Sequence, residues 1–397
     1  MNILMISSYL PFPLYDGGSI RLYNLISELQ KKHSVTLICE KRPKQTQEDV
    51  KALEKICKKV ITVPRRKQWS TGNILKTGVS SDSFLITGHT LPEMTNAISR
   101  ELINEKYDVI HVETSYVFQN LPEVTLPTVL VEHNIEYMVY QKFMNKAPFF
   151  LKPFLKVDIE KLRRQEESFW RRATQVVTVS DLEKTIVEKT GVKARVVYNG
   201  VDLKSFQYKD VDEASKAQPK QFLFIGNYKW LQNRDSARFI IQDIWPKIKE
   251  KSEEVVSLRI VGRDMPDDIR SVKDDTIIIE ENSPRKTQEI FAESFALLAP
   301  IRIGGGSQYK ILESMAVGTP TITTSLGLSG LDVTKGRDLL VADSANGIVD
   351  LCLGLLNDQK LYRSLAKNGR EQIEKKYDWS AIAKALEDVY LEIRHNR

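Results

Sequence analysis

The chain has 397 residues, enough for two domains of ordinary size, and its composition (42% hydrophobic, 28% charged) is that of a soluble globular protein. The formal net charge of +6 is compatible with anionic ligands or an anionic membrane surface, but it is too small to require either. The three isolated cysteines argue against a disulfide framework and against a cysteine-based zinc site. No apolar stretch reaches the ~18 residues of a membrane span and no leader pattern opens the chain, so we expect a cytoplasmic protein.

The first half of the chain alternates short apolar runs with helical patterns. Residues 2–7 and 34–39 predict strands that flank a helix over residues 18–30, which is a βαβ opening. Ser180 and Glu183 have the spacing of a capping box and predict the start of a later helix. Further short strands are expected at residues 60–63, 109–112, 128–131, 176–179 and 195–198.

The second half repeats this alternation after a polar stretch, residues 203–220, that is typical of a linker. Both halves therefore predict a doubly wound α/β domain with a parallel sheet. We expect an N-terminal domain over residues 1–200, a C-terminal domain over residues 201–377, and a last helix over residues 378–397. Strands are expected at residues 222–225, 258–261, 276–279 and 295–300, with helices at residues 235–248 and 286–293.

A glycine loop, Gly304–Gly306, follows the last of these strands and leads into a helical pattern that stops at residues 318–320. Such a loop presents free backbone N–H groups to an anion, with Ser307 as the expected N-cap. Lys310 and Glu313 are three residues apart and share a helix face. An exposed ion pair is one interpretation. A cation for phosphate and a carboxylate for sugar hydroxyls is the other, and it predicts a site for a phosphorylated sugar or a nucleotide.

A second glycine pair, Gly17 and Gly18, opens the first helix. It predicts either a tight turn or close approach of the backbone to a phosphate or an acceptor. Glu40 ends the second strand, as in dinucleotide-binding proteins. However, the G-x-G-x-x-G spacing is absent, so NAD binding is disfavoured.

Ligands of doubly wound sheets bind beyond the carboxyl ends of the strands. Among the histidines in such positions, His133 lies beside Glu132 and Asn134 and is the stronger candidate for catalysis. His111 is more typical of a hydrogen-bonded structural residue. The residues that directly follow strands are Gly17, Gly18, His111, Glu113, Glu132, His133, Gly226, Asn227, Gly262, Arg263 and Gly304–Ser307.

Residues 141–175 combine aromatic side chains with nine basic and four acidic residues. A solvated helix that covers the domain, contact with an anionic bilayer, and contact with nucleic acid all remain open, although no nucleic-acid module supports the last. Asp210 and Asp212 have the Asp-x-Asp form of some metal-dependent sugar transferases, but they lie in the polar linker and are interpreted as solvated charge.

Seven segments, in their order and spacing, resemble the family-four retaining glycosyltransferases of the GT-B fold (glycosyl transferases group 1) over nearly the whole chain. They are PLYDGGSIR, TVLVEHN, VVTVSDLEK, VVYNGVD, FIGNY, RIVGR and KILESMAVGTPTITT. The resemblance implies two Rossmann-like domains that face an interdomain cleft, with the last helix packing back on the first domain. It implies no cofactor and no required metal. It also implies a nucleoside-diphosphate sugar as donor and a glycan, lipid-linked or glycoside acceptor, as in polysaccharide or glycoconjugate biosynthesis.

The resemblance also implies roles for individual residues. His133 matches the histidine that approaches the transferred sugar, Glu313 matches the glutamate that binds the ribose, and Lys310 is expected to stabilise the leaving diphosphate. The donor-binding set is Gly17, Gly18, Gly226, Asn227, Arg263, Gly304, Gly305, Gly306, Ser307, Gln308, Lys310 and Glu313.

The chain departs from the family pattern in two places. Gly305 stands where the first of the paired glutamates is usual, and the Arg/Lys pair of the second domain is not clear, with Lys229 and Arg234 as candidates. Lys310, with Arg302, is expected to take over the phosphate role. An epimerase or phosphorylase on the same architecture, and a non-catalytic subunit that binds sugar nucleotides, remain alternatives.

Overall fold

The computed structural model describes residues 1–209, 211–212, 218–303 and 309–395. The chain divides into two compact units. Unit 1 consists of Met1–Tyr198 with Ile382–Arg397, and unit 2 consists of Asn199–Ala381.

The described strands of unit 1 form a parallel sheet in the order β3-β2-β1-β4-β5-β6-β7. The order reverses beside β1, which pairs with both β2 and β4, so the carboxyl ends of β1 and β4 form the topological switch point. In register, Ser7 at the end of β1 lies opposite Glu113 at the end of β4. The strands are β1 (Asn2–Ser7), β2 (Ser34–Lys41), β3 (Lys59–Pro64), β4 (Val109–Glu113), β5 (Thr128–Glu132), β6 (Gln175–Thr178) and β7 (Ala194–Val196).

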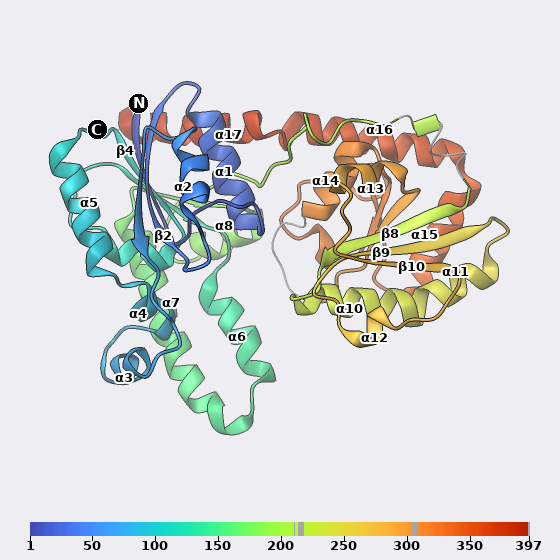
Figure 1. Ribbon diagram of the computed structural model, residues 1–397, viewed down its shortest axis with the longest axis horizontal. Coiled ribbons are helices and arrows are strands. Elements are labelled where there is room, and N and C mark those ends of the chain that lie inside the picture. The colour runs from blue at the N-terminus through green and yellow to red at the C-terminus, as the bar shows by residue number, and fades with distance from the viewer. Residues whose placement is uncertain (210, 213–217, 304–308, 396–397) are drawn as a thin grey trace. The chain divides into compact units, whose positions relative to one another are not determined.

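Helices cover both faces of this sheet (Figure 1). The first helix begins where Asp16 caps it, accepting a hydrogen bond from the Ser19 N–H at 2.9 Å, and it buries Leu22, Leu25 and Ile26 at helical spacing. The helices are α1 (Gly17–Leu29), α2 (Gln47–Glu54), α3 (Thr71–Val79), α4 (Phe84–His89), α5 (Pro92–Asn104), α6 (Glu136–Lys146), α7 (Lys152–Arg172) and α8 (Asp181–Glu188), with the short turns η1 (Ser115–Asn120) and η2 (Phe149–Leu151). The last helix, α17 (Trp379–His395), belongs to unit 1 from Ile382 onward.

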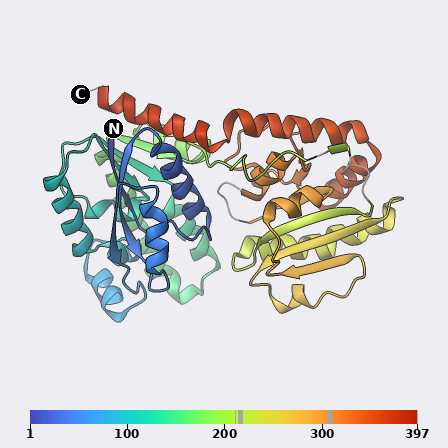
Figure 2. The same cartoon turned by 45° about the horizontal axis from the view of Figure 1, so that its top comes forward.

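Unit 2 repeats the plan with a second sheet (Figure 2). Its described strands are parallel and have the order β10-β9-β8-β11-β12-β13. Its switch point lies between β8 and β11, and both strands bury apolar side chains in the core of this unit. The strands are β8 (Lys220–Asn227), β9 (Val256–Arg263), β10 (Ile277–Glu281), β11 (Ala296–Ala299), β12 (Thr321–Thr323) and β13 (Leu340–Val341).

The helices of unit 2 also lie on both faces of its sheet (Figure 1). They are α10 (Leu231–Phe239), α11 (Trp245–Lys251), α12 (Asp267–Arg270), α13 (Thr287–Glu293), α14 (Tyr309–Val317), α15 (Ala345–Asn357) and α16 (Gln359–Lys376), with the 3-10 turn η4 (Leu326–Leu328). The helix predicted over residues 235–248 lies within a longer helical run, residues 231–251, that is not regular along its length. A π-helical turn, η3 (Ile240–Ile244), separates α10 from α11, whose second residue is Pro246. Proline lacks the N–H that a continuous α-helix needs there.

The two doubly wound parallel sheets confirm the predicted α/β class. Among the described residues, no helix is both long and apolar enough to cross a membrane.

Candidate functional site

The carboxyl end of β4 holds an ionised carboxylate between two histidines. His111 Nε2 lies 2.5 Å from Glu113 Oε2, and His133 Nε2 lies 2.6 Å from Glu113 Oε1. Since an ionised carboxylate accepts hydrogen bonds, both imidazoles carry their proton on Nε2 when they are neutral. The sequence predicted His133 at this edge of the sheet, and the structure adds the carboxylate that orients its ring.

Glu113 is fully buried, and its charge is compensated locally. Burial alone would raise its pKa, but the His133 imidazole and the hydrogen bonds from His111 and His133 outweigh burial and hold the pKa of Glu113 well below its usual range. The Arg21 guanidinium lies 3.5 Å away and adds positive charge. The carboxylate therefore stays ionised and holds His133 in one orientation.

The last helix supplies the outer end of this network. The Tyr390 hydroxyl lies 2.6 Å from His111 Nδ1, and the ring meets the imidazole edge to face. With Nε2 of His111 donating to Glu113, Nδ1 accepts the proton of Tyr390. One chain of hydrogen bonds thus runs from α17 through β4 to His133. The prediction that His111 is structural fits these contacts.

Glu132 also ends a strand, but it lies inside unit 1 rather than in the network around His133. Its Oε1 accepts a hydrogen bond from Trp170 Nε1 at 2.6 Å, and burial raises its pKa to about 8. The neighbouring Glu166 accepts from the N–H groups of Glu136 and Tyr137 and so fixes the start of α6. These contacts anchor the turn that carries His133.

The absence of a side chain on Gly18, at the start of α1, lets the Tyr9 ring lie against the helix backbone. A Cβ on Gly18 would lie 2.9 Å from the Tyr9 hydroxyl, so a side chain there would displace the ring. The Tyr9 hydroxyl is buried and has no hydrogen-bond partner among the described residues. Burial, followed by the charge of Glu113, raises the pKa of Tyr9 well above its usual range, so Tyr9 remains a neutral donor beside Gly17 and Gly18.

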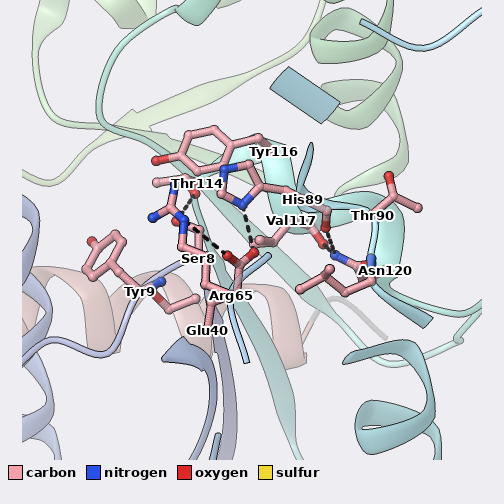
Figure 3. A network of polar contacts seen from close by, with 12 residues as sticks. Ser8, Tyr9, Glu40, Arg65, His89, Thr90, Thr114, Tyr116, Val117 and Asn120 are labelled. Carbon is pink, nitrogen blue, oxygen red and sulfur yellow. Dashed lines mark hydrogen bonds and ion pairs between the residues drawn. The ribbon is translucent and has the colours of Figure 1, made fainter. Parts of the chain in front are cut away.

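A second polar network lies at the ends of β1, β2 and β3 (Figure 3). His89 Nδ1 lies 2.7 Å from Glu40 Oε1, while Arg65 Nε approaches the other oxygen only to 3.7 Å. That oxygen, Oε2, is buried and has no hydrogen-bond partner among the described residues. Beside this network, Thr114 has φ = 80°, a strained backbone for a β-branched residue. Buried polar atoms that lack a hydrogen-bond partner, next to a strained backbone, are typical of a binding site.

In unit 2, a chain of hydrogen bonds links β8, α10 and α14. Lys310 Nζ donates to Asn233 Oδ1 at 2.6 Å, and Asn233 Nδ2 donates to the Asn227 carbonyl at 2.8 Å. Lys310 also lies 4.6 Å above the Phe224 ring, which attracts the ammonium. Gly226 and Gly262 pack so closely that a Cβ on Gly262 would lie 1.9 Å from the Gly226 carbonyl oxygen.

The cation and the carboxylate of α14 titrate near neutrality. Burial lowers the pKa of Lys310 to about 7 and raises that of Glu313 to about 7, although each partly offsets the shift of the other. Groups with pKa values this far from the ordinary are typical of ligand sites. The structure thus brings Asn227 and Lys310 together through Asn233, which the sequence analysis did not name.

The other basic candidates of unit 2 have their own partners. Arg302 donates to both carboxylate oxygens of Asp235 at 3.0 Å, and the Arg234 guanidinium donates to the Tyr228 carbonyl. Both guanidinium groups are therefore engaged, and Arg302 is less available for phosphate than expected. Arg263 ends β9 and is exposed. The predicted contributors Gly304, Gly305, Gly306, Ser307 and Gln308 lie outside the described residues.

Sequence reasoning missed four contributors: Tyr9, His89, Asn233 and Tyr390. Tyr9 lies within two residues of the end of β1, so the strand-end rule could have included it. Asn233 and Tyr390 lie on helices, and His89 ends one, so nothing in the sequence connects them to a strand end.

Two family models match the chain, one in each half. Residues 15–205 match Glycosyltransferase Family 4, and residues 219–358 match Glycosyl transferases group 1. Together with the two Rossmann-like sheets, these matches show that the chain belongs to this family of GT-B glycosyltransferases.

Curated relatives match at low identity. A Klebsiella pneumoniae protein, described as an uncharacterized 44.6 kDa protein in the cps region, is 21% identical over 97% of this chain and 98% of its own length. The phosphatidyl-myo-inositol mannosyltransferase of Mycolicibacterium smegmatis is 25% identical over 54% of this chain and 56% of its own length.

Solved structures share the fold across the chain. Sucrose-phosphate synthase from Thermosynechococcus elongatus superposes with a TM-score of 0.71 at 16% identity and covers all of both chains. Anabaena HepE, in complex with UDP-glucose, gives a TM-score of 0.65 at 12% identity over 99% of this chain and all of its own.

Proposed function

We propose that this glycosyltransferase moves a sugar from a nucleoside-diphosphate sugar to a hydroxyl acceptor with retention of anomeric configuration. One observation carries the proposal. Lys310 is linked by hydrogen bonds through Asn233 to Asn227 at the switch point of unit 2, and Lys310 lies on α14 three residues before Glu313. Relatives add support, because one is a mannosyltransferase and a structural neighbour binds UDP-glucose.

In this proposal α14 supplies the two groups that recognise the donor. Lys310 neutralises the diphosphate, whose negative charge grows as the glycosidic bond breaks, and it needs no metal for this role. Glu313 accepts hydrogen bonds from the ribose hydroxyls once it is ionised. Asn233 restricts the Lys310 side chain before the donor arrives, so less side-chain entropy is lost on binding.

His133 positions the transferred sugar. Its Nε2 is committed to Glu113, which leaves Nδ1 as the polar atom that can meet a sugar hydroxyl. Attack by the acceptor comes from the face that the diphosphate leaves, and a donor phosphate oxygen takes the acceptor proton. Retention follows from this geometry without a covalent intermediate on the protein.

The acceptor is assigned to the strand ends of unit 1. The Tyr9 hydroxyl and Glu40 Oε2 are buried polar atoms without a hydrogen-bond partner in the described part of the chain. A buried donor and a buried acceptor of this kind are satisfied by the hydroxyl groups of a sugar. Tyr9→Phe and Glu40→Gln are therefore expected to raise the KM for acceptor more than the KM for donor.

Donor screening followed by product analysis tests the proposal. A panel of nucleoside-diphosphate sugars should include one that raises the thermal unfolding temperature, and transfer from it should give a product with the anomeric configuration of the donor, measured by NMR coupling constants. Glu313→Ala and Lys310→Ala should each lose activity. Unchanged activity in both variants, or an inverted product, would overturn the assignment. Turnover after dialysis against a chelator tests metal independence.

A further inference from the structure

Exposed apolar side chains gather in two segments of unit 1. Residues 66–80 and 139–157 hold 11 of the 21 large apolar side chains that are exposed in the described part of the chain. In the first segment they are Trp69, Ile74, Leu75 and Val79, and in the second Val139, Phe143, Phe149, Phe150, Leu151, Phe154 and Val157. We call these two segments together the apolar tip.

The packing of unit 1 does not account for the exposed side chains of α3. This nine-residue helix buries none of its residues, and Leu75 and Val79 are 72% and 91% exposed. Phe149, in η2, and Phe154, in the first turn of α7, are 83% and 75% exposed. Single exposed apolar residues are ordinary, but a cluster of this size marks an interaction surface.

The two segments belong to one end of unit 1. Lys161 Nζ, on α7, donates to the Thr77 carbonyl at 2.8 Å and to the Ser80 carbonyl at 2.7 Å, which ties α3 to α7. Figures 1 and 2 both show α3 and the hairpin of α6 and α7 projecting from the same end of this unit. The apolar tip is therefore a continuous region of the molecule.

The charge of the apolar tip has one sign. The chain has 52 acidic residues, yet residues 66–80 and 139–157 contain none of them and contain seven basic residues. Lys142, Lys152 and Lys156 are exposed among the phenylalanines. Lysine stems lie along apolar surface while their ammonium groups reach toward anions.

We propose that the apolar tip docks unit 1 on a bilayer that contains anionic lipids. The aromatic and aliphatic side chains insert at the headgroup boundary, and the lysines meet lipid phosphates and anionic headgroups. A second copy of the chain is a poorer occupant, because two such surfaces would place lysine against lysine. This inference goes beyond the proposed function, since it concerns where the protein acts and holds for any sugar that it transfers.

Sedimentation of the full chain with large vesicles tests the proposal. Binding is expected to vesicles rich in phosphatidylglycerol and to be much weaker for pure phosphatidylcholine, and salt should weaken it by screening. Lys152→Gln/Lys156→Gln should lower the partition coefficient by about 30-fold, since each basic residue near an anionic surface contributes about fivefold. Phe149→Ser/Phe154→Ser should lower it at least as much on both kinds of vesicle, because insertion is apolar.

Ile103→Ser/Lys106→Glu is the matched control. Ile103 is 83% exposed, like Phe149, and Lys106 is an exposed lysine. Ile103 lies on α5 and Lys106 lies two residues after its end, so both are outside the apolar tip. The control should bind vesicles as the unmodified chain does. An equal loss in the control, or no preference for anionic vesicles, would overturn the proposal. Concentration-dependent dimerisation that the Phe149→Ser/Phe154→Ser variant abolishes, without any vesicle binding, would overturn it in favour of a second copy.

Discussion

The two units shift the pKa of a site carboxylate in opposite directions. In unit 1, two imidazoles and a guanidinium surround Glu113 and hold its pKa well below the ordinary value. In unit 2, burial raises the pKa of Glu313 to about 7, and the nearby Lys310 only partly offsets it. The first carboxylate is ionised at every physiological pH, whereas the second changes its charge near neutrality.

This difference has a physical cause. Compensation by three partners makes the Glu113 network a rigid support, because every charge in it is already satisfied. Lys310 donates to the neutral Asn233, and within the described part of the chain neither Lys310 nor Glu313 forms an ion pair as close as those around Glu113. A bound diphosphate would supply negative charge to Lys310, and the ribose hydroxyls would donate hydrogen bonds to Glu313. The comparison therefore predicts that substitutions in the Glu113 network act mainly on the transfer rate, and that substitutions of Lys310 and Glu313 act mainly on donor affinity.

The largest effect is expected from Glu113→Gln. The neutral amide has one acceptor oxygen where the carboxylate has two, so it cannot accept from both imidazoles. His133 then loses its orientation, and the single-turnover transfer rate should fall by about 10²–10⁴. Glu101→Gln is the control, since Glu101 is also buried and bonded to Lys59 and Tyr107 but lies on α5. If the two variants lose rate equally, or if Glu113→Gln changes only the KM for donor, the positioning role is wrong.

The next effect is expected from Lys310→Ala, which should weaken donor binding by about 10- to 100-fold through loss of a charged hydrogen bond in a partly enclosed site. Calorimetric titration with the nucleotide sugar measures it. Lys209→Ala is the matched control, because burial also lowers the pKa of Lys209 to about 7, but its ammonium donates to the Ser294 carbonyl. A loss of affinity in Lys209→Ala that equals the loss in Lys310→Ala would show that stability alone explains both.

The third test is the pH dependence of donor affinity. The dissociation constant of the donor is expected to change by at most about tenfold per pH unit. The pKa of Lys310 is lowered to about 7, so the free protein loses this proton as the pH rises through 7, and phosphate binding should weaken in the same interval. The measurement is made in the Glu313→Gln variant, which lacks the second group with a pKa of about 7. In that background, Lys310→Arg should bind the donor independently of pH, since arginine keeps its charge. A dissociation constant that stays flat with Lys310 intact would contradict the role of this lysine.

The smallest effect is expected from Tyr390→Phe. It removes one hydrogen bond to His111 and leaves the ring contact, so the free energy of unfolding should fall by about 0.5–1.5 kcal/mol and the transfer rate severalfold. Equilibrium denaturation and single-turnover kinetics measure the two. A full loss of activity with unchanged stability would place Tyr390 in contact with substrate instead.

The sequence by itself determined the alternation of strands and helices, because apolar periodicity and capping residues are local properties. The strand over residues 2–7, the helix after the Gly17–Gly18 pair and the end of α14 before Gly318 all follow from neighbours in the chain. It also selected His133, Asn227, Lys310 and Glu313, since each lies at a strand end or beside a glycine loop. Their roles as site residues remain predictions.

Only the tertiary structure decided which side chains meet. Tyr390 and His111 are 279 residues apart, and Lys310 and Asn233 are 77 apart, so no local pattern could pair them. The same holds for the pKa values of Glu113 and Glu313. Two glutamates with the same intrinsic chemistry acquire opposite shifts, because burial and the number of charged partners are set by packing and not by the residue itself.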